Sequence, residues 1–189
     1  MILGNIREFD WINEPENVSF TESGLQITAL PETDFWQNID ENFSKDSGHL
    51  FAVAQDSDFV LDCKWYFEKI KDSAQCGIMA RVDERNWIKF GLLSPNVYLP
   101  QIGAIVANRG SSDWSMVEIP DNTQSLWFKL RRCKKDFICY YSLDGEKYHT
   151  IRMVHLPTAD KSVRVGAYAC SPKSDGFECV LEEIRLKRL

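Results

Sequence analysis

Alternation of apolar and polar residues is the feature that most constrains the fold of this chain. The odd-numbered positions of residues 59–67 are all apolar: Phe59, Leu61, Cys63, Trp65 and Phe67. A period of two residues places successive side chains on opposite faces of a strand. Residues 25–29, 126–131 and 163–169 repeat the pattern. These segments predict antiparallel sheets that have one apolar and one polar face.

Turn-forming residues separate the predicted strands. Asp144-Gly145 predicts a type I′ hairpin turn, because this dipeptide tolerates the positive φ that both central residues need. Lys134-Lys135 predicts a second turn. Longer loops are expected at three segments that contain proline: residues 95–96, 120–122 and 172–176.

The alternation changes phase near the C-terminus, between residues 177–181 and residues 184–186. A β-bulge near Glu182-Glu183 would return both sets of apolar residues to one face. Residues 34–45 are compatible with a turn of helix. Many short strands separated by turns predict an all-β sandwich or barrel, and 189 residues suit a single domain over residues 1–189.

Composition and charge exclude several classes of protein. The chain has a net charge of −6 and therefore lacks the overall basic character that is typical of a nucleic-acid-binding domain. The sequence has no basic start followed by an apolar run and no long apolar stretch, so we expect no signal peptide, no membrane span and a cytoplasmic location. None of the six cysteines forms a C-x-x-C pair, which favours reduced, buried thiols over disulfides or metal ligands.

One predicted hairpin defines a candidate binding face. A turn at residues 83–85 gives a register that places the apolar residues together: Ala80 opposite Ile88, Ile78 opposite Phe90 and Cys76 opposite Leu92. The second face then carries Gln75, Met79, Arg81, Trp87 and Lys89. A tryptophan can cover the C–H groups of a sugar while basic and amide groups bond hydroxyls or a carboxylate. The alternative is an ordinary solvated sheet face that carries one tryptophan.

Several ordered segments resemble one known family. Residues 75–83 and 87–91 resemble a core of the form Q-A-G-hydrophobic-M-x-R-x-D followed by W-hydrophobic-K-x-G. Residues 33–36, 48–50 and 112–115 resemble its T-D-F-W, G-H and S-D-W-S segments. Later matches follow in three segments: residues 127–132, 141–145 and 165–168.

Together these segments span about residues 20–187 and resemble the DUF1349 family, a family without an assigned function whose fungal members carry a label concerning enolase regulation. The resemblance implies a jelly-roll sandwich of the concanavalin A-like lectin and glucanase fold, with a concave face that can hold a ligand. Two family carboxylate positions hold other residues here, Ala74 and Leu93, which weakens any acid–base chemistry.

The sequence offers no recognisable catalytic set. Glycoside hydrolysis needs two carboxylates about 5 to 10 Å apart, and the E-x-D-x-E arrangement of glucanases with this fold is absent. Asp83-Glu84 and Glu182-Glu183 are expected to be solvated charges. No G-x-S-x-G elbow accompanies the histidines, although a distant cysteine–histidine pair stays open. We therefore assign no catalytic residue.

No cofactor or metal is expected. The cysteines and histidines lack zinc-ligand spacing. Calcium stays open at Asp56-Ser57-Asp58 and at Asp113, where the alternative is turn chemistry, in which Asp and Ser bond their own backbone.

The sequence thus favours a non-catalytic binding domain for a carbohydrate or a small polar sugar-derived metabolite. The predicted ligand-binding residues come from the hairpin face and the family-like segments: Trp36, His49, Gln75, Arg81, Trp87, Lys89, Arg109 and Trp114. His49 either contacts ligand beside Trp36 or is structural, and Trp114 either covers a ligand or packs a loop. The alternatives are a protein-interaction or regulatory domain that contacts a metabolic enzyme, and a weak sugar-active enzyme.

Overall fold

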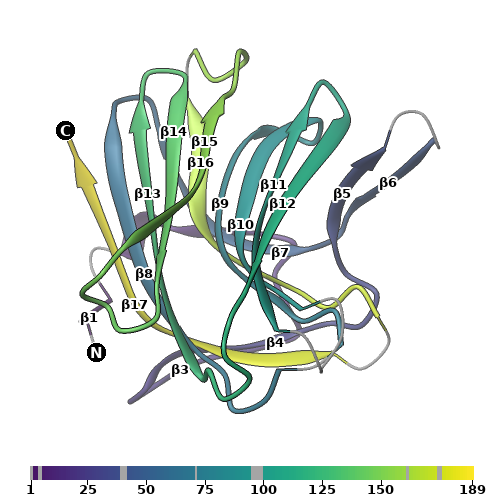
Figure 1. The fold of residues 1–189 in the computed structure, drawn as a ribbon, viewed down its shortest axis with the longest axis vertical. Coiled ribbons are helices and arrows are strands. Elements are labelled where there is room, and N and C mark those ends of the chain that lie inside the picture. Colours follow the sequence, from purple (N-terminus) through teal and green to yellow (C-terminus); the bar gives the residue numbers. More distant parts are fainter. Residues whose placement is uncertain are drawn as a thin grey trace.

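The computed structural model confirms the all-β prediction: two sheets pack face to face (Figure 1). It describes residues 2–3, 6–38, 42–70, 72–94, 100–160, 162–173 and 176–189. The helix in these ranges is the 3-10 turn η1 (Ile6–Glu8). The described ranges hold no helix that could span a bilayer.

The first sheet has eight strands, of which seven form a continuous antiparallel path. Their order is β15 (His149–His155), β14 (Asp136–Ser142), β13 (Ser125–Cys133), β8 (Phe59–Tyr66), β17 (Phe177–Arg188), β4 (Gly24–Ala29) and β3 (Asn17–Thr21). The eighth, β1 (Ile2–Leu3), pairs with β17 in parallel. The predicted bulge in the last strand is confirmed, because the β17–β8 register shifts between Leu181 and Glu183.

The second sheet has nine strands. Their order is β2 (Asp10–Ile12), β7 (His49–Gln55), β16 (Val163–Cys170), β9 (Gln75–Asp83), β10 (Asn86–Leu93), β11 (Gln101–Asn108), β12 (Ser111–Glu118), β5 (Phe35–Asn38) and β6 (Phe43–Asp46). The predicted β9–β10 register is confirmed, with Ala80 opposite Ile88 and Arg81 opposite Trp87. The register shifts next to Asn86, so the turn itself is short and carries a bulge.

The main core lies between the two sheets. Phe90 of the nine-stranded sheet meets Phe128 of the eight-stranded sheet edge to face, with ring centroids 5.9 Å apart. The Trp65 indole N–H crosses the same space and donates to the Gly77 carbonyl at 3.2 Å. Each fully buried large side chain of this kind stabilises the fold by about 1.5–3 kcal/mol, so the sandwich rests on this inner layer.

A second, smaller apolar cluster lies on the opposite, outer face of the nine-stranded sheet. Its members come from six strands: Phe35, Leu50, Ala52, Met79, Trp87, Leu93, Ile105, Ala107, Tyr168 and Cys170. The hairpin β5–β6 contributes Phe35 and stands on the side of this sheet that faces away from the eight-stranded sheet (Figure 1). The sheet is therefore covered on both faces.

In the described part of residues 34–45, the structure has two strands in place of the turn of helix with which this sequence is compatible. Phe35 and Gln37 are buried while Trp36 and Asn38 are half-buried, which is the period of a strand, and residues 35–38 pair with residues 43–46. Because Phe35 can enter the outer cluster only from one side of an extended segment, packing selects the strand.

The turn predictions have mixed outcomes. The Lys134-Lys135 turn and the loop at residues 120–122 are confirmed. The type I′ turn is wrong: residues 143–148 form a longer loop in which Gly145 but not Asp144 has positive φ. The Asp144 carboxylate instead accepts the backbone N–H groups of Glu146 and Lys147, which lowers its pKa to about 2. The segment at residues 95–96 and part of 172–176 lie outside the described residues.

Candidate functional site

A cleft of about 420 Å³ opens on the outer face of the nine-stranded sheet, beside the hairpin β5–β6. Aromatic, amide, hydroxyl and charged side chains all reach it. Its lining consists of Asp34, Trp36, Phe43, Lys45, Ser73, Gln75, Leu93, Ser94, Ile105, Trp114 and Pro172. The volume lies within the range of small-molecule sites.

Two tryptophans from different elements form the aromatic wall. Trp36 of β5 and Trp114 of β12 have ring centroids 6.2 Å apart and planes inclined by 73°. Trp114 is 44% exposed and Phe43 is 48% exposed, so both rings present free surface. Gly103 lies opposite Met116 on β12 and makes room for this wall, because a Cβ at residue 103 would come within 2.9 Å of the Trp114 Nε1.

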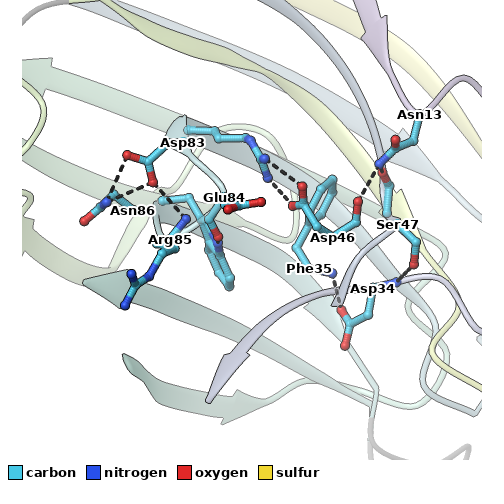
Figure 2. A network of polar contacts seen from close by, with 12 residues as sticks. Asn13, Asp34, Phe35, Asp46, Ser47, Asp83, Glu84, Arg85 and Asn86 are labelled. Carbon is cyan, nitrogen blue, oxygen red and sulfur yellow. Dashed lines mark hydrogen bonds and ion pairs between the residues drawn. The ribbon is translucent and has the colours of Figure 1, made fainter. Parts of the chain in front are cut away.

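A buried lysine holds the polar floor of the cleft. The Lys89 ammonium group lies 2.6 Å from the Asp34 carboxylate and 2.8 Å from the Gln75 side-chain oxygen, with no exposed side-chain surface. Asp34 also accepts the backbone N–H of Phe35 at 2.8 Å (Figure 2). Gln75 and Asp34 both line the cleft, so Lys89 fixes their orientation from below.

The Arg81 guanidinium attaches the hairpin to the sheet. It pairs with both carboxylate oxygens of Asp46 on β6 and lies 5.7 Å from the Phe35 ring centroid. The Asp46 carbonyl in turn accepts a side-chain N–H of Asn13 at 2.8 Å (Figure 2). Arg81 is therefore occupied by a carboxylate of the protein itself.

The sequence pattern predicts Trp87 and Lys89 on an accessible face, either a binding face or a solvated one, whereas the structure buries both side chains. Neither side chain has exposed surface, because the hairpin β5–β6, with its buried Phe35, covers them. The Trp87 indole N–H donates to the Glu84 carbonyl at 3.1 Å. The Lys89 ammonium lies 5.8 Å from the ring centroids of Trp87 and Tyr168, within the range of a cation–π contact.

His49 makes the hydrogen bonds of a structural residue. The Leu30 N–H donates to its Nε2 at 3.1 Å, so its Nδ1 carries the proton and donates to the Asn13 carbonyl at 2.6 Å. Burial lowers the pKa of His49, which favours this neutral form. Of the two interpretations from the sequence, the geometry supports the structural one.

Arg109 lies in the β11–β12 turn with a φ of 53°. Its backbone N–H donates to the Asn86 side chain at 3.0 Å, and its carbonyl accepts from the Arg85 guanidinium at 3.0 Å. It is not among the residues that line the cleft.

The comparisons with known proteins place the chain in a family. The model of the family described as "Protein of unknown function (DUF1349)" matches residues 11–189. The chain is a member of the DUF1349 family. "Regulation of enolase protein 1" of Saccharomyces cerevisiae is 30% identical to it over 176 residues, which cover 92% of this chain and 86% of that protein.

Several solved structures share the fold of this DUF1349 member. A functionally unknown protein from Saccharomyces cerevisiae has a TM-score of 0.89 and 25% identity, with 98% of this chain and 99% of that chain covered. The carbohydrate binding module CBM66 from Bacillus subtilis has a TM-score of 0.62 and 13% identity, with 99% of both chains covered. The GH43 protein BlXynB from Bacillus licheniformis has a TM-score of 0.77 and 15% identity, with 96% of this chain but 37% of that chain covered. These likenesses confirm the lectin- and glucanase-like sandwich.

Three of the segments by which the chain resembles the DUF1349 family meet at the cleft. The T-D-F-W segment supplies Asp34 and Trp36, and the S-D-W-S segment supplies Trp114. The segment at the β9–β10 hairpin supplies Gln75, which Lys89 contacts from beneath. Three of the eight predicted residues thus line the cleft: Trp36, Gln75 and Trp114. The sequence interpretation missed Phe43 and Lys45, whose same-side spacing on β6 becomes a signal only once β6 is recognised as a strand.

Metal binding gains no support in this DUF1349 member. Among the described residues, no group of three or more His, Cys, Asp or Glu side chains is placed to hold an ion. Asp113 pairs with Arg152, and the Asp58 carboxylate accepts the Lys134 backbone N–H at 2.6 Å. Both carboxylates are thus engaged by distant parts of the chain and not by the local turn bonds that the alternative predicts.

Proposed function

We propose that the protein is a non-catalytic binding domain for a carbohydrate or a small sugar-derived metabolite. The observation that carries the proposal is the pair of partly exposed tryptophans, Trp36 and Trp114, above a floor of fixed polar groups. The face of an indole ring can cover the C–H surface of a sugar, while Gln75 and Ser73 line the same cleft and bring polar groups that suit sugar hydroxyls.

The polar groups favour binding over hydrolysis. Most glycosidases use two carboxylates that flank the scissile bond. Asp34 is the one carboxylate among the described residues that line the cleft, and it is engaged by Lys89 and the Phe35 N–H. All six cysteines are unpaired thiols, which fits the cytoplasmic location that we propose.

A thermal-shift screen of mono- and oligosaccharides tests the proposal. A ligand at a hundred times its dissociation constant stabilises the folded state by about 2.7 kcal/mol. We expect Trp36→Ala and Trp114→Ala to abolish the shift. Trp127→Ala should retain it, because Trp127 is a half-buried tryptophan on the outer face of the other sheet. Loss of the shift in Trp127→Ala, or its survival in both cleft variants, would contradict the assignment to this cleft.

A protein partner is the second candidate. Met116 lies two residues beyond Trp114 on the same face of β12 and continues its exposed apolar surface. Among the described residues, β12 pairs with β5 at Ser111 alone. The name of one relative, "Regulation of enolase protein 1", is consistent with a protein partner. A pull-down of metabolic enzymes that fails with Met116→Asp but succeeds with Trp36→Ala would favour the partner over the sugar.

A further inference from the structure

The charges at the cleft do not balance, although the chain as a whole is acidic. Two charged side chains occur among the described residues that line it: Asp34 and Lys45. The chain carries a net charge of −6, so a local positive charge is not a reflection of overall composition. Which ligand this charge favours depends on whether Asp34 can offset Lys45.

Asp34 is already neutralised from within the protein. The buried ammonium group of Lys89 lies 2.6 Å from its carboxylate, and 13% of the Asp34 side chain is exposed. Arg81, the other buried cation of this face, is matched by Asp46. The charges cancel within each of these two pairs, and Lys45 remains as a net charge of about +1 at the cleft.

The Lys45 ammonium group is positioned but not neutralised. It donates to the Glu32 carbonyl at 3.0 Å, which uses one of its three N–H donors. In the part of the chain that the structure describes, no carboxylate forms an ion pair with Lys45. The backbone contact fixes the ammonium group beside the tryptophans, and its charge is available to a bound molecule.

From this arrangement we infer that the cleft selects a sugar that carries a single carboxylate, such as a uronic acid, and that Lys45 determines this specificity. The inference rests on the proposed function, since the tryptophans supply the sugar-binding surface. A carboxylate carries one charge, which one lysine matches. A phosphate monoester carries about −1.5 to −2 at pH 7, which leaves charge without a partner.

Matched sugars that differ only at C6 test the inference: glucose against glucuronate, and galactose against galacturonate, by titration calorimetry of the full chain. A charge-assisted hydrogen bond at a half-buried site gives about a tenfold preference for at least one uronate. Lys45→Gln should reduce this preference to about one. Lys135→Gln is the control, because Lys135 also donates to a backbone carbonyl, at 2.9 Å, on the other sheet.

The outcomes separate the inference from the proposed function. Equal affinity for the neutral and acidic members of both pairs, lost in Trp36→Ala, overturns the role of Lys45 and leaves sugar binding intact. Tighter binding of glucose 6-phosphate than of glucuronate overturns the choice of a carboxylate. If neither uronate binds, the inference fails, and the oligosaccharide screen decides whether sugar binding fails with it.

Discussion

Lys89 shows how one buried charge organises the residues around it. Its ammonium group joins Asp34, which lies 55 residues away along the chain, to Gln75 on the neighbouring strand. Removing one partner of a buried pair leaves the other charge uncompensated, which costs more than the pair contributes when intact.

We expect Lys89→Met to lower the free energy of unfolding by about 3 kcal/mol, because Asp34 loses its counter-charge in a nearly buried position. Chemical denaturation measures the change. The double variant Lys89→Met with Asp34→Asn should lose at least about 1 kcal/mol less than the sum of the two single variants. Additive losses would show that the two side chains are not coupled.

Trp87 and Trp114 should respond differently to truncation, although each lies beside polar residues in the sequence. Trp87→Ala removes a fully buried ring and should cost about 3–5 kcal/mol in unfolding free energy. Trp114→Ala removes a half-exposed ring and should cost less than about 1.5 kcal/mol. Equal losses in urea denaturation would contradict this difference in burial.

The sequence could predict which face of β9 and β10 carries Trp87 and Lys89, but not that this face is covered. Alternation reports the side on which a residue lies. Whether that side meets water depends on the hairpin β5–β6, whose partner residues are distant in the chain. Trp36, Gln75 and Trp114 were predictable because motifs and residue type pointed to them.

At the scale of elements, the hairpin β5–β6 determines the shape of the cleft. Its two strands have four residues each, too few for alternation to separate strand from helix. By contrast, β9 and β10 are long, and a shift of one residue in their pairing would expose the core, so their register was predictable from the sequence.

The attachment of the hairpin is open to a direct test. We expect Asp46→Ala to raise hydrogen exchange in β5 and β6, because it removes the bidentate contact of Arg81, while exchange in β9 and β10 stays unchanged. The loss of stability should be about 1 kcal/mol, since the Asp46 side chain is 34% exposed. Ser44→Ala, at an exposed position of β6, is the control.

His49 joins the start of β7 to two loops and should make stability depend on pH. Burial lowers its pKa in the folded state, so the unfolded chain binds the proton at higher pH. The unfolding free energy should therefore fall as pH drops below about 6.5. Above that value, neutral His49 makes its full contribution to stability. His49→Gln should flatten this dependence, whereas a variant of the exposed His149 should not. An unchanged slope in His49→Gln would contradict the assignment.

At the scale of the whole molecule, the cysteines report on global unfolding. Five are buried and Cys133 is exposed, so the expectation of burial from the sequence is wrong for Cys133 alone. Burial also raises the pKa of the Cys139 and Cys170 thiols, which suppresses the reactive thiolate.

A thiol reagent should therefore modify one cysteine in the native chain and all six once it is unfolded in denaturant. Counting modified thiols by mass spectrometry checks both numbers. A second thiol that reacts well before the unfolding transition would indicate local opening of the sandwich. Fewer than six in denaturant without reductant would indicate disulfides.

The inter-sheet core and the outer cluster share no residue. Substitutions at Leu93, Ile105 or Trp114 alter the cleft without creating a cavity between the sheets, and the inner aromatic layer can vary without reshaping the cleft. Natural selection for a ligand can therefore act on positions that leave the inter-sheet core intact. A lineage with this architecture can exchange one ligand for another by small steps, each of which leaves the protein able to fold.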